Sequence, residues 1–433
     1  MAFSIVVAAI TVLVMITGVL FFPVIRLGKL KIDCYWVIAL LGASVMLLSG
    51  SVDADKLIHA LTDNCAINPI KILVLFISMT VLSIFLDEVG FFRYLANKAL
   101  SLARKSQLQL FVVLYITVSV LTVFTSNDII VLTFTPFICY FAKNANISPV
   151  PYLVGEFVAA NTMSMTFIIG NPTNIYIATS YGINFFDYFT VMLLPTLTAS
   201  LVAFLILLLL FKKQLSIPAS AMMQDIKIQN KTFLIIGLCD LIICTVLLAI
   251  GSYIGLDMWI VSLAAALLLY IVIAVISLIK RSGLATLTKT AKRAPWQLVP
   301  FVLSMFVIIL AMQQNGVTAT INNALGNSHT VFSYGASSFF AANLINNIPM
   351  SVLFCPIIQP LEGASQMQAV YATVVGSNLG AYLTPIGALA GIMWMGMLKE
   401  HEVKFGYADF MKYGFAVAIP TLIACLAVLD FVI

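Results

Sequence analysis

Residues 125–136 read Thr-Ser-Asn-Asp-Ile-Ile-Val-Leu-Thr-Phe-Thr-Pro, and the first four interrupt an apolar segment, Leu108–Ala142. A second apolar segment, Thr330–Pro360, is interrupted in the same way by Asn346 and Asn347. Non-helical backbone at membrane depth is stable only where it is buried in protein or lines a cavity. Both segments are therefore predicted to be re-entrant hairpins, which enter and leave the membrane on the same side.

The composition indicates a membrane protein. The 433 residues are 62% hydrophobic and only 9% charged, and the mean hydropathy is +1.09. Soluble domains average about 45–50% apolar and 25% charged residues. Apolar runs of spanning length, about 20 residues, recur along the chain, and helices this long exclude an outer-membrane barrel. The net charge of +5 is spread over short loops, so it does not indicate a nucleic-acid partner.

An all-α polytopic membrane fold with ten spans and two hairpins is predicted. The first apolar run lacks the basic segment of a cleaved signal peptide, so it is predicted to be a retained span. Two spans, Val154–Thr179 and Met367–Met397, are interrupted. Phe91–Gln107 is either an interfacial helix or a solvated connector. The uninterrupted spans are roughly Ala2–Val24, Tyr35–Gly50, Ile72–Leu86, Val191–Phe211, Thr232–Ile254, Met258–Ile279, Leu298–Met312 and Tyr413–Phe431.

The distribution of basic residues predicts the orientation. Lys and Arg favour cytoplasmic loops. Ten crossings that start outside place 20 of the 22 Lys and Arg residues on the cytoplasmic side, and only Lys56 and Lys71 fall outside. We therefore expect a cell inner (cytoplasmic) membrane protein with both termini outside.

The two halves of the chain show the same order of elements. Residues 1–211 and 232–433, joined by a cytoplasmic linker at 212–231, each contain five spans, one hairpin and one interrupted helix. A shift of 220 residues aligns Asn127 with Asn347 and Pro136 with Pro356. Because five crossings are an odd number, the second half is predicted to be inverted relative to the first. Many secondary transporters have this plan.

Four polar clusters lie at the interruptions and form the candidate site for a solute or a coupling ion. Pro and Gly stop a helix and free backbone groups, and freed amides and carbonyls at half-helix ends carry partial charges that bind small ligands. The alternative is that these residues only repair breaks in a packed bundle. The predicted binding residues are Ser126, Asn127 and Asp128; Asn161, Gly170, Asn171, Pro172, Thr173 and Asn174; Asn343, Asn346 and Asn347; and Ser377, Asn378, Thr384, Pro385 and Gly387.

Asp128 and Glu156 are the candidates for proton coupling. A bare carboxylate near the bilayer centre costs at least about 2.5–3.5 kcal/mol, so Asp128 must be protonated, paired with a cation or hydrated. The alternative role for Asp128 is a helix N-cap. Asp240 is expected to make a structural bond. Asp87 and Glu88 are expected to lie at the membrane interface.

No catalytic residues, cofactor or definite metal site are predicted, although a sodium ion near Asn127 and Asn347 is possible. The seven cysteines show no Cys-x-x-Cys pair, and their spacing suits neither a disulfide framework nor a zinc site.

At these clusters the sequence resembles the ArsB-type permeases of the ion transporter superfamily, which is related to sodium/dicarboxylate and sodium/proton carriers. The resemblance rests on Ser126-Asn127-Asp128 with Thr135-Pro136, on residues 169–174 and 346–349, and on residues 379–390. Many ArsB-type proteins have Gly-x-Asp-Leu-Gly-Pro-Lys where residues 376–382 read Gly-Ser-Asn-Leu-Gly-Ala-Tyr. The acid and the base are absent here.

The resemblance implies proton-linked efflux of arsenite or antimonite, a homodimer, and an elevator-like mechanism. The scaffold is then expected in 1–107 and 232–316, and the transport domain in 108–211 and 330–433. The second hypothesis is a sodium-coupled carrier, either a sodium/proton antiporter or a dicarboxylate symporter.

Other functional classes are disfavoured by what the sequence lacks. Motifs of membrane-embedded enzymes such as His-Glu-x-x-His are absent, and so is the Gly-x-x-x-x-Gly-Lys loop of an ATP-driven pump. A separate ATPase subunit remains a possible partner, and hairpins entering from opposite sides favour alternating access over an ion channel.

Overall fold

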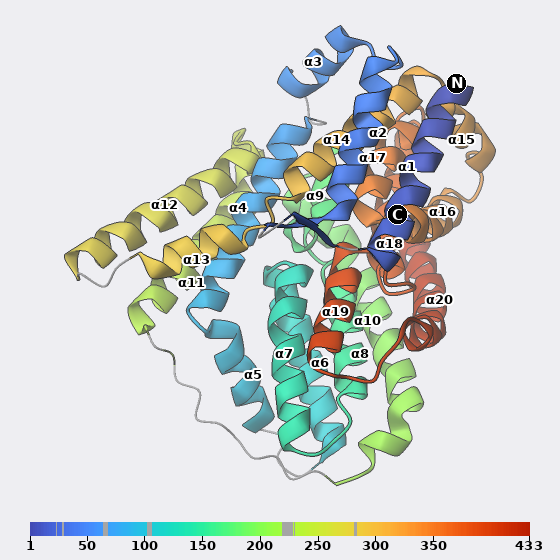
Figure 1. Ribbon diagram of the computed structural model, residues 1–433. Helices are drawn as coiled ribbons and strands as arrows, with labels where there is room; N and C mark the ends of the chain where they lie inside the picture. Colours follow the sequence, from blue (N-terminus) through green and yellow to red (C-terminus); the bar gives the residue numbers. More distant parts are fainter. Residues whose placement is uncertain are drawn as a thin grey trace.

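The computed structural model describes residues 1–22, 24–27, 30–63, 68–101, 106–218, 228, 230–280 and 284–433. Nearly all of these residues are helical, as the sequence predicts (Figure 1). The one departure is a short antiparallel hairpin of β1 (Val24–Leu27) and β2 (Leu30–Asp33), which follows the first helix.

One set of helices comes from the residues assigned to the scaffold. Among them, α2 packs against α1 and α14, and α4 packs against α12. The members are α1 (Ala2–Phe21), α2 (Cys34–Leu48), α3 (Ala54–Thr62), α4 (Pro69–Glu88), α5 (Phe91–Ser101), α11 (Lys231–Gly251), η2 (Ser252–Ile254), α12 (Met258–Ile279), α13 (Ala285–Arg293) and α14 (Leu298–Gln314). The short helix α15 (Val317–Leu325) lies between the ranges assigned to the two domains and packs against α14 and α17.

A second set comes from the residues assigned to the transport domain. Here α16 packs against α18, α10 against α20 and α6 against α8. The members are α6 (Gln107–Phe124), α7 (Asn127–Asn144), α8 (Val150–Met163), η1 (Ile168–Gly170), α9 (Pro172–Ser180), α10 (Phe185–Leu215), α16 (Thr330–Ile345), α17 (Asn347–Ile358), α18 (Gly363–Gly380), α19 (Leu389–Glu400) and α20 (Tyr407–Val432). Movement of one set against the other stays a prediction.

The helices break where the polar clusters interrupt the sequence. The first hairpin turns at Thr125 and Ser126, between α6 and α7, and the second turns at Asn346, between α16 and α17. The aligned residues Asn127 and Asn347 each begin the second arm of a hairpin. The interrupted spans break at 164–171 and at 381–388.

Each hairpin enters and leaves at one end of the molecule. The Tyr152 hydroxyl at the start of α8 donates to Gln107 Oε1 at the start of α6 (3.0 Å). At the second hairpin, Asn322 Nδ2 of α15 donates to the Tyr334 hydroxyl (2.9 Å) and to the Ile357 carbonyl (2.8 Å). In Figure 1 the arms α6 and α7 lie in the lower half and α16 and α17 in the upper half. The inversion of the two repeats stays a prediction.

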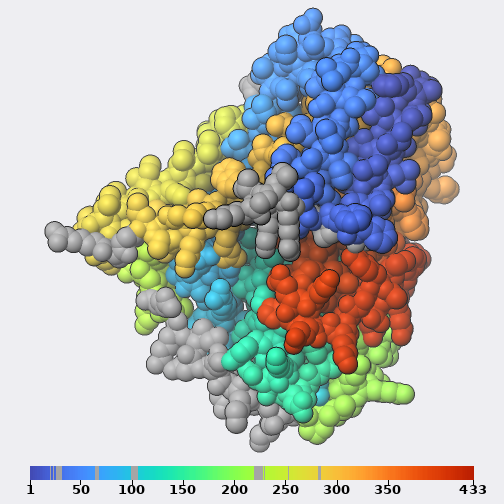
Figure 2. Space-filling model, in the orientation of Figure 1, coloured from blue at the N-terminus to red at the C-terminus, as the bar shows by residue number. Residues whose placement is uncertain are grey.

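The outer surface of the bundle is apolar. Among the described residues, eight helices are long and apolar enough to cross a membrane, and α2 and α17 are shorter apolar helices. On α11 and α12, Ile242, Leu268 and Ile271 are 56–61% exposed. Such a surface requires lipid around it. Figure 2 shows α12 and α13, in yellow, projecting from the body of the molecule.

The buried acidic residues of the scaffold differ in their partners. Asp87 and Glu88, at the end of α4, pair with Arg293 of α13 at 2.8 Å and 2.6 Å. Asp240 of α11 was expected to make a structural bond. That expectation is wrong for its Oδ2 atom, which is buried and has no hydrogen-bond partner among the described residues.

Candidate functional site

The tip of the first hairpin is tied to the first interrupted helix. Asn127 Nδ2, at the start of α7, donates to Asn161 Oδ1 of α8 (3.0 Å). Asn161 Nδ2 in turn donates to the Phe157 carbonyl one turn earlier (2.8 Å). Asn161 lies two residues before α8 ends, so it holds the hairpin tip against the helix break.

Asn378 joins the two interrupted helices. Its Oδ1 accepts from Asn171 Nδ2 and from Ser164 Oγ, both at 2.9 Å, and its Nδ2 donates to Asn174 Oδ1 at 2.7 Å. Asn174 Nδ2 donates to the Ser164 carbonyl (2.8 Å). All four side chains are buried. This group, the Asn378 network, connects residues more than 200 positions apart.

The tip of the second hairpin is tied to the second interrupted helix. Asn343 Oδ1 accepts from the Thr384 amide (3.0 Å) and the Thr384 hydroxyl (2.7 Å). The Asn347 amide donates to the Gly387 carbonyl (3.0 Å), and Asn346 Nδ2 donates to the Ile386 carbonyl (3.1 Å). Each hairpin tip therefore contacts the break of an interrupted helix.

Two predicted binding residues repair helix ends, as the alternative hypothesis requires. Asn171 Oδ1 accepts from the Thr173 amide (3.2 Å) and caps α9, which begins at Pro172. Asn346 Oδ1 accepts from the Ile348 amide (3.3 Å) and caps α17. Asn346 has φ +72°, a left-handed conformation that is uncommon outside glycine. Helix repair accounts for part of these clusters.

Other polar atoms at the breaks have no protein partner. Ser126 Oγ, Asn127 Oδ1 and Ser377 Oγ are buried, and none has a hydrogen-bond partner among the described residues. A buried polar group without a partner costs about 1–3 kcal/mol. A bound solute, ion or water that supplied the missing bonds would recover that free energy.

Asp128 is not the N-cap of α7, which begins at Asn127. Ser126 is the N-cap of α7, and Asp128 lies in the first turn, where a negative charge interacts favourably with the helix dipole. The helix that contains Asp128, α7, packs against α4 and α5 of the set described first.

Glu156 lies deeper within its own set of helices. The Thr135 hydroxyl of α7 donates to both of its carboxylate oxygens, at 3.0 and 3.1 Å. The Trp394 indole of α19 lies against the same carboxylate without hydrogen-bond geometry. Figure 2 shows the C-terminal helices, in red, against the teal segment that contains α7. Glu156 therefore joins α7, α8 and α19 and is separate from the hairpin tips.

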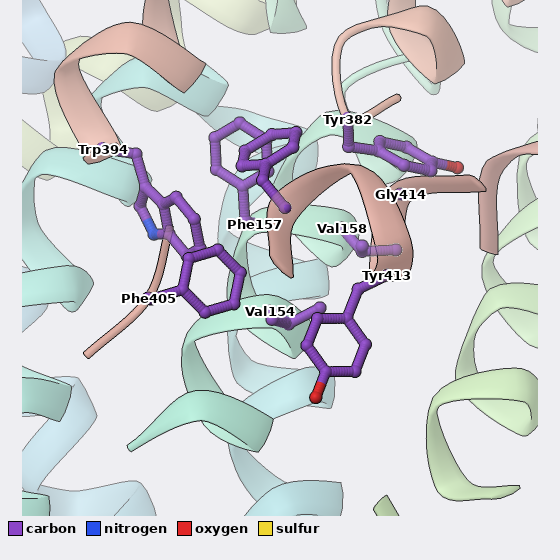
Figure 3. A pocket seen from close by; sticks show the side chains of 9 residues that line it. Val154, Phe157, Val158, Tyr382, Trp394, Phe405, Tyr413 and Gly414 are labelled. Atoms are coloured by element: carbon purple, nitrogen blue, oxygen red, sulfur yellow. The ribbon is translucent and has the colours of Figure 1, made fainter. Parts of the chain in front are cut away.

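A small cavity between α8, α19 and α20 is lined by aromatic rings. Figure 3 shows Trp394, Phe405, Tyr413 and Phe157 around it. Its volume is about 20 Å³, which is room for one water at most. Because the rings pack on one another at centroid distances of 5.0–6.1 Å, we interpret this cavity as a packing void and not as a solute site.

Several residues of this region were missed from the sequence. Ser164, Thr135 and Tyr382 were not predicted as site residues, although Ser164 bonds three of the predicted asparagines, Asn161, Asn174 and Asn378. The Thr162 hydroxyl donates to the Tyr382 hydroxyl across the two halves (3.3 Å). Ser164 lies within the polar run 161–166, and that run could have indicated Ser164 as a site residue.

Gly170 is expected to be irreplaceable at its position. A Cβ atom at Gly170 would overlap the Ser164 carbonyl, which accepts from Asn174. Gly170→Ala should therefore destabilise the protein by about 1–3 kcal/mol and lower its melting temperature in detergent. Gly396→Ala is the matched control, because nothing lies within 4 Å of the added atom in α19. Equal melting temperatures for the two variants would contradict this account of the break.

Comparison with known proteins places the chain among transporters. It is 26% identical over 373 residues to an arsenical pump membrane protein of Escherichia coli strain K12, covering 82% of this chain and 84% of that protein. An arsenical pump membrane protein of Yersinia enterocolitica is 26% identical over 379 residues, with the same coverage. A 46 kDa membrane protein of Mycobacterium leprae is 22% identical over 367 residues, covering 81% and 84%.

The fold is similar to that of a solved transporter. The YdaH transporter of Alcanivorax borkumensis superimposes with a TM-score of 0.57 at 14% identity, covering 99% of this chain and 97% of that one. This likeness supports the fold alone. Residues 34–371 match the citrate transporter family, CitMHS. The chain therefore belongs to the CitMHS citrate transporter family and is a multi-pass membrane transporter of the ArsB type.

Proposed function

We propose that this protein exports arsenite, antimonite or a closely related small solute in exchange for protons, by elevator-type alternating access in the inner membrane. The observation that carries the proposal is the chemistry of the helix breaks. Their polar side chains are the amides of Asn127 and Asn378, the hydroxyls of Ser126 and Ser377 and similar neutral groups, with Asp128 as the one carboxylate. Arsenite at neutral pH is an uncharged trihydroxide, which neutral donors and acceptors suit.

Both the relatives and the site support an uncharged solute. The relatives named above include arsenical pump membrane proteins. A carboxylate substrate would carry charge into a buried site, and such a charge is costly unless it is paired. Among the residues that the structure describes, no lysine or arginine belongs to the three hydrogen-bonded groups at the breaks. Protons would then be carried by Asp128, with both termini outside and the protein a homodimer.

A sodium-coupled carboxylate carrier is the second candidate. Two observations favour it: the family is described as citrate transporters, and the unpartnered Ser126 Oγ and Asn127 Oδ1 are oxygen acceptors that would suit a sodium ion. Oxygen ligands from side chains and half-helix carbonyls bind sodium in other carriers with broken helices.

Flux into liposomes separates the two candidates. Purified protein is reconstituted, and a proton or a sodium gradient is imposed with arsenite, antimonite or citrate on one side. We expect arsenite or antimonite flux that requires the proton gradient, exceeds that of protein-free liposomes at least tenfold, and does not respond to sodium. Citrate flux that requires sodium, with no metalloid flux, would replace the first proposal with the second.

A further inference from the structure

Two cavities lie next to each other between the two sets of helices. The larger has a volume of about 180 Å³ and is lined by residues of α3, α9, α14 and α17, among them Tyr176, Gln313 and Gln359. The smaller is lined by residues of α4, α9, α14 and α17, among them Thr173, Tyr176 and Ile348. Tyr176 of α9 borders both cavities.

The same faces of three helices line both cavities. On α14 the lining residues Leu298, Val302, Phe306 and Gln313 recur at helical spacing along one face. On α9, Thr173 and Tyr176 are three positions apart and share one face. The two cavities are therefore parts of one seam, formed by α14 on one side and by α9 and α17 on the other.

The seam connects the helix breaks with one end of the molecule. Its inner end contains Thr173, whose amide bonds Asn171, and Ile348, whose amide bonds Asn346. Its outer end contains Ala60 of α3 and the exposed pair Gln313 and Gln359, whose side chains are joined by a hydrogen bond from Nε2 to Oε1 of 3.3 Å.

We propose that this seam is the route by which solute passes between the helix breaks and the face that carries α3 and α15, and that Tyr176 is its internal gate. The proposal rests on the proposed transport function. Tyr176 is 4% exposed and lines both cavities, so its side chain is placed where a gate between them would act. The Gln313–Gln359 bond closes the outer end.

The side chains that line the seam also limit which class of solute is able to pass through it. Its polar groups are hydroxyls and amides of Thr173, Tyr176, Ser351, Gln313 and Gln359, and the remaining lining is apolar. A multiply charged carboxylate would lose its water here without gaining a cationic partner, at a large cost in free energy. A small uncharged solute loses little free energy when it gives up its water in the seam. The route therefore selects neutral hydroxylated molecules.

Thiol labelling tests the gate without any knowledge of the solute. Ser351 of α17 lines the inner cavity and is 1% exposed. In full-length protein in detergent, Ser351→Cys is allowed to react with N-ethylmaleimide, and mass spectrometry of the peptide containing residue 351 gives the rate. We expect Tyr176→Ala to raise this rate at least tenfold. Tyr176→Phe, which keeps the ring, should leave the rate unchanged.

A second tyrosine controls for general loosening of the bundle. Tyr152 of α8 is 1% exposed and lies outside the seam. If Tyr152→Ala accelerates labelling of residue 351 as much as Tyr176→Ala does, or if neither changes it, Tyr176 is not the gate. Failure of the flux experiment with every solute would refute the proposed function and would leave this labelling result unaffected.

Discussion

Asn378→Ala is expected to reduce transport at least a hundredfold and to lower the melting temperature by several degrees. The substitution removes the acceptor of Asn171 Nδ2 and Ser164 Oγ and the donor to Asn174 Oδ1. All three partners are buried, and each unsatisfied group costs about 1–3 kcal/mol. Flux is measured in liposomes, and stability is measured by thermal denaturation in detergent.

Two variants separate the loss of the network from the loss of an asparagine. Asn378→Asp retains an oxygen acceptor for Asn171 and Ser164 but loses the donor to Asn174 Oδ1 and to the Val374 carbonyl. We expect it to keep only part of the stability that the alanine variant loses. Asn184→Ala removes an asparagine whose bond to Asp187 is at the surface, and it should leave both quantities near wild type. Normal flux in Asn378→Ala would mean that the Asn378 network contributes to packing and not to transport.

Asp128→Asn is expected to abolish transport driven by a proton gradient while exchange of solute for solute continues. The asparagine resembles the protonated carboxyl group permanently, so a cycle that requires release of the proton stops. Asp128 is the only carboxylate at either hairpin tip, since Ile348 occupies the aligned position. Gradient-driven flux and exchange flux are measured in one liposome preparation, and the first should fall at least tenfold relative to the second.

The other buried carboxylate of the transport helices provides the comparison. Glu156→Gln keeps an acceptor for the Thr135 hydroxyl, so the packing of α7 against α8 should persist. If Glu156→Gln loses proton-driven flux while Asp128→Asn keeps normal flux, then Glu156, and not Asp128, couples proton movement to transport. A loss of sodium dependence alone in Asp128→Asn would instead favour a sodium site at the first tip.

The positions of the helix breaks could be read from the sequence because the residues that break helices act locally. Proline lacks an amide hydrogen and asparagine competes for backbone groups, whatever the rest of the chain does. The breaks at 164–171, at Asn346 and at 381–388 therefore coincide with Asn171-Pro172, Asn346-Asn347 and Thr384-Pro385. The pairing of strands β1 and β2 was not predicted from the sequence, because four-residue strands with basic side chains resemble a loop.

Partners distant in sequence could not be predicted. Asn378 could have faced a solute, a carbonyl or another amide, and its residue type is compatible with all three. The same holds for Asp240, whose Oδ2 atom lacks the expected bond among the described residues, and for Asp128, whose alternative role as N-cap is filled by Ser126. Side-chain identity limits the bonds that a group is able to make, whereas its neighbours decide which bonds form.

The amino-acid sequence by itself determined that the chain is a helical membrane protein, that it contains two hairpins and two interrupted helices, and which polar residues lie at the breaks. These properties follow from hydropathy and from local backbone chemistry. Only the tertiary structure decided that Asn378 bonds Asn171 and Asn174, that Glu156 accepts from Thr135, and that α9, α14 and α17 enclose a seam bordered by Tyr176. These contacts join residues separated by tens to hundreds of positions, so they depend on how whole helices pack, which no local pattern encodes.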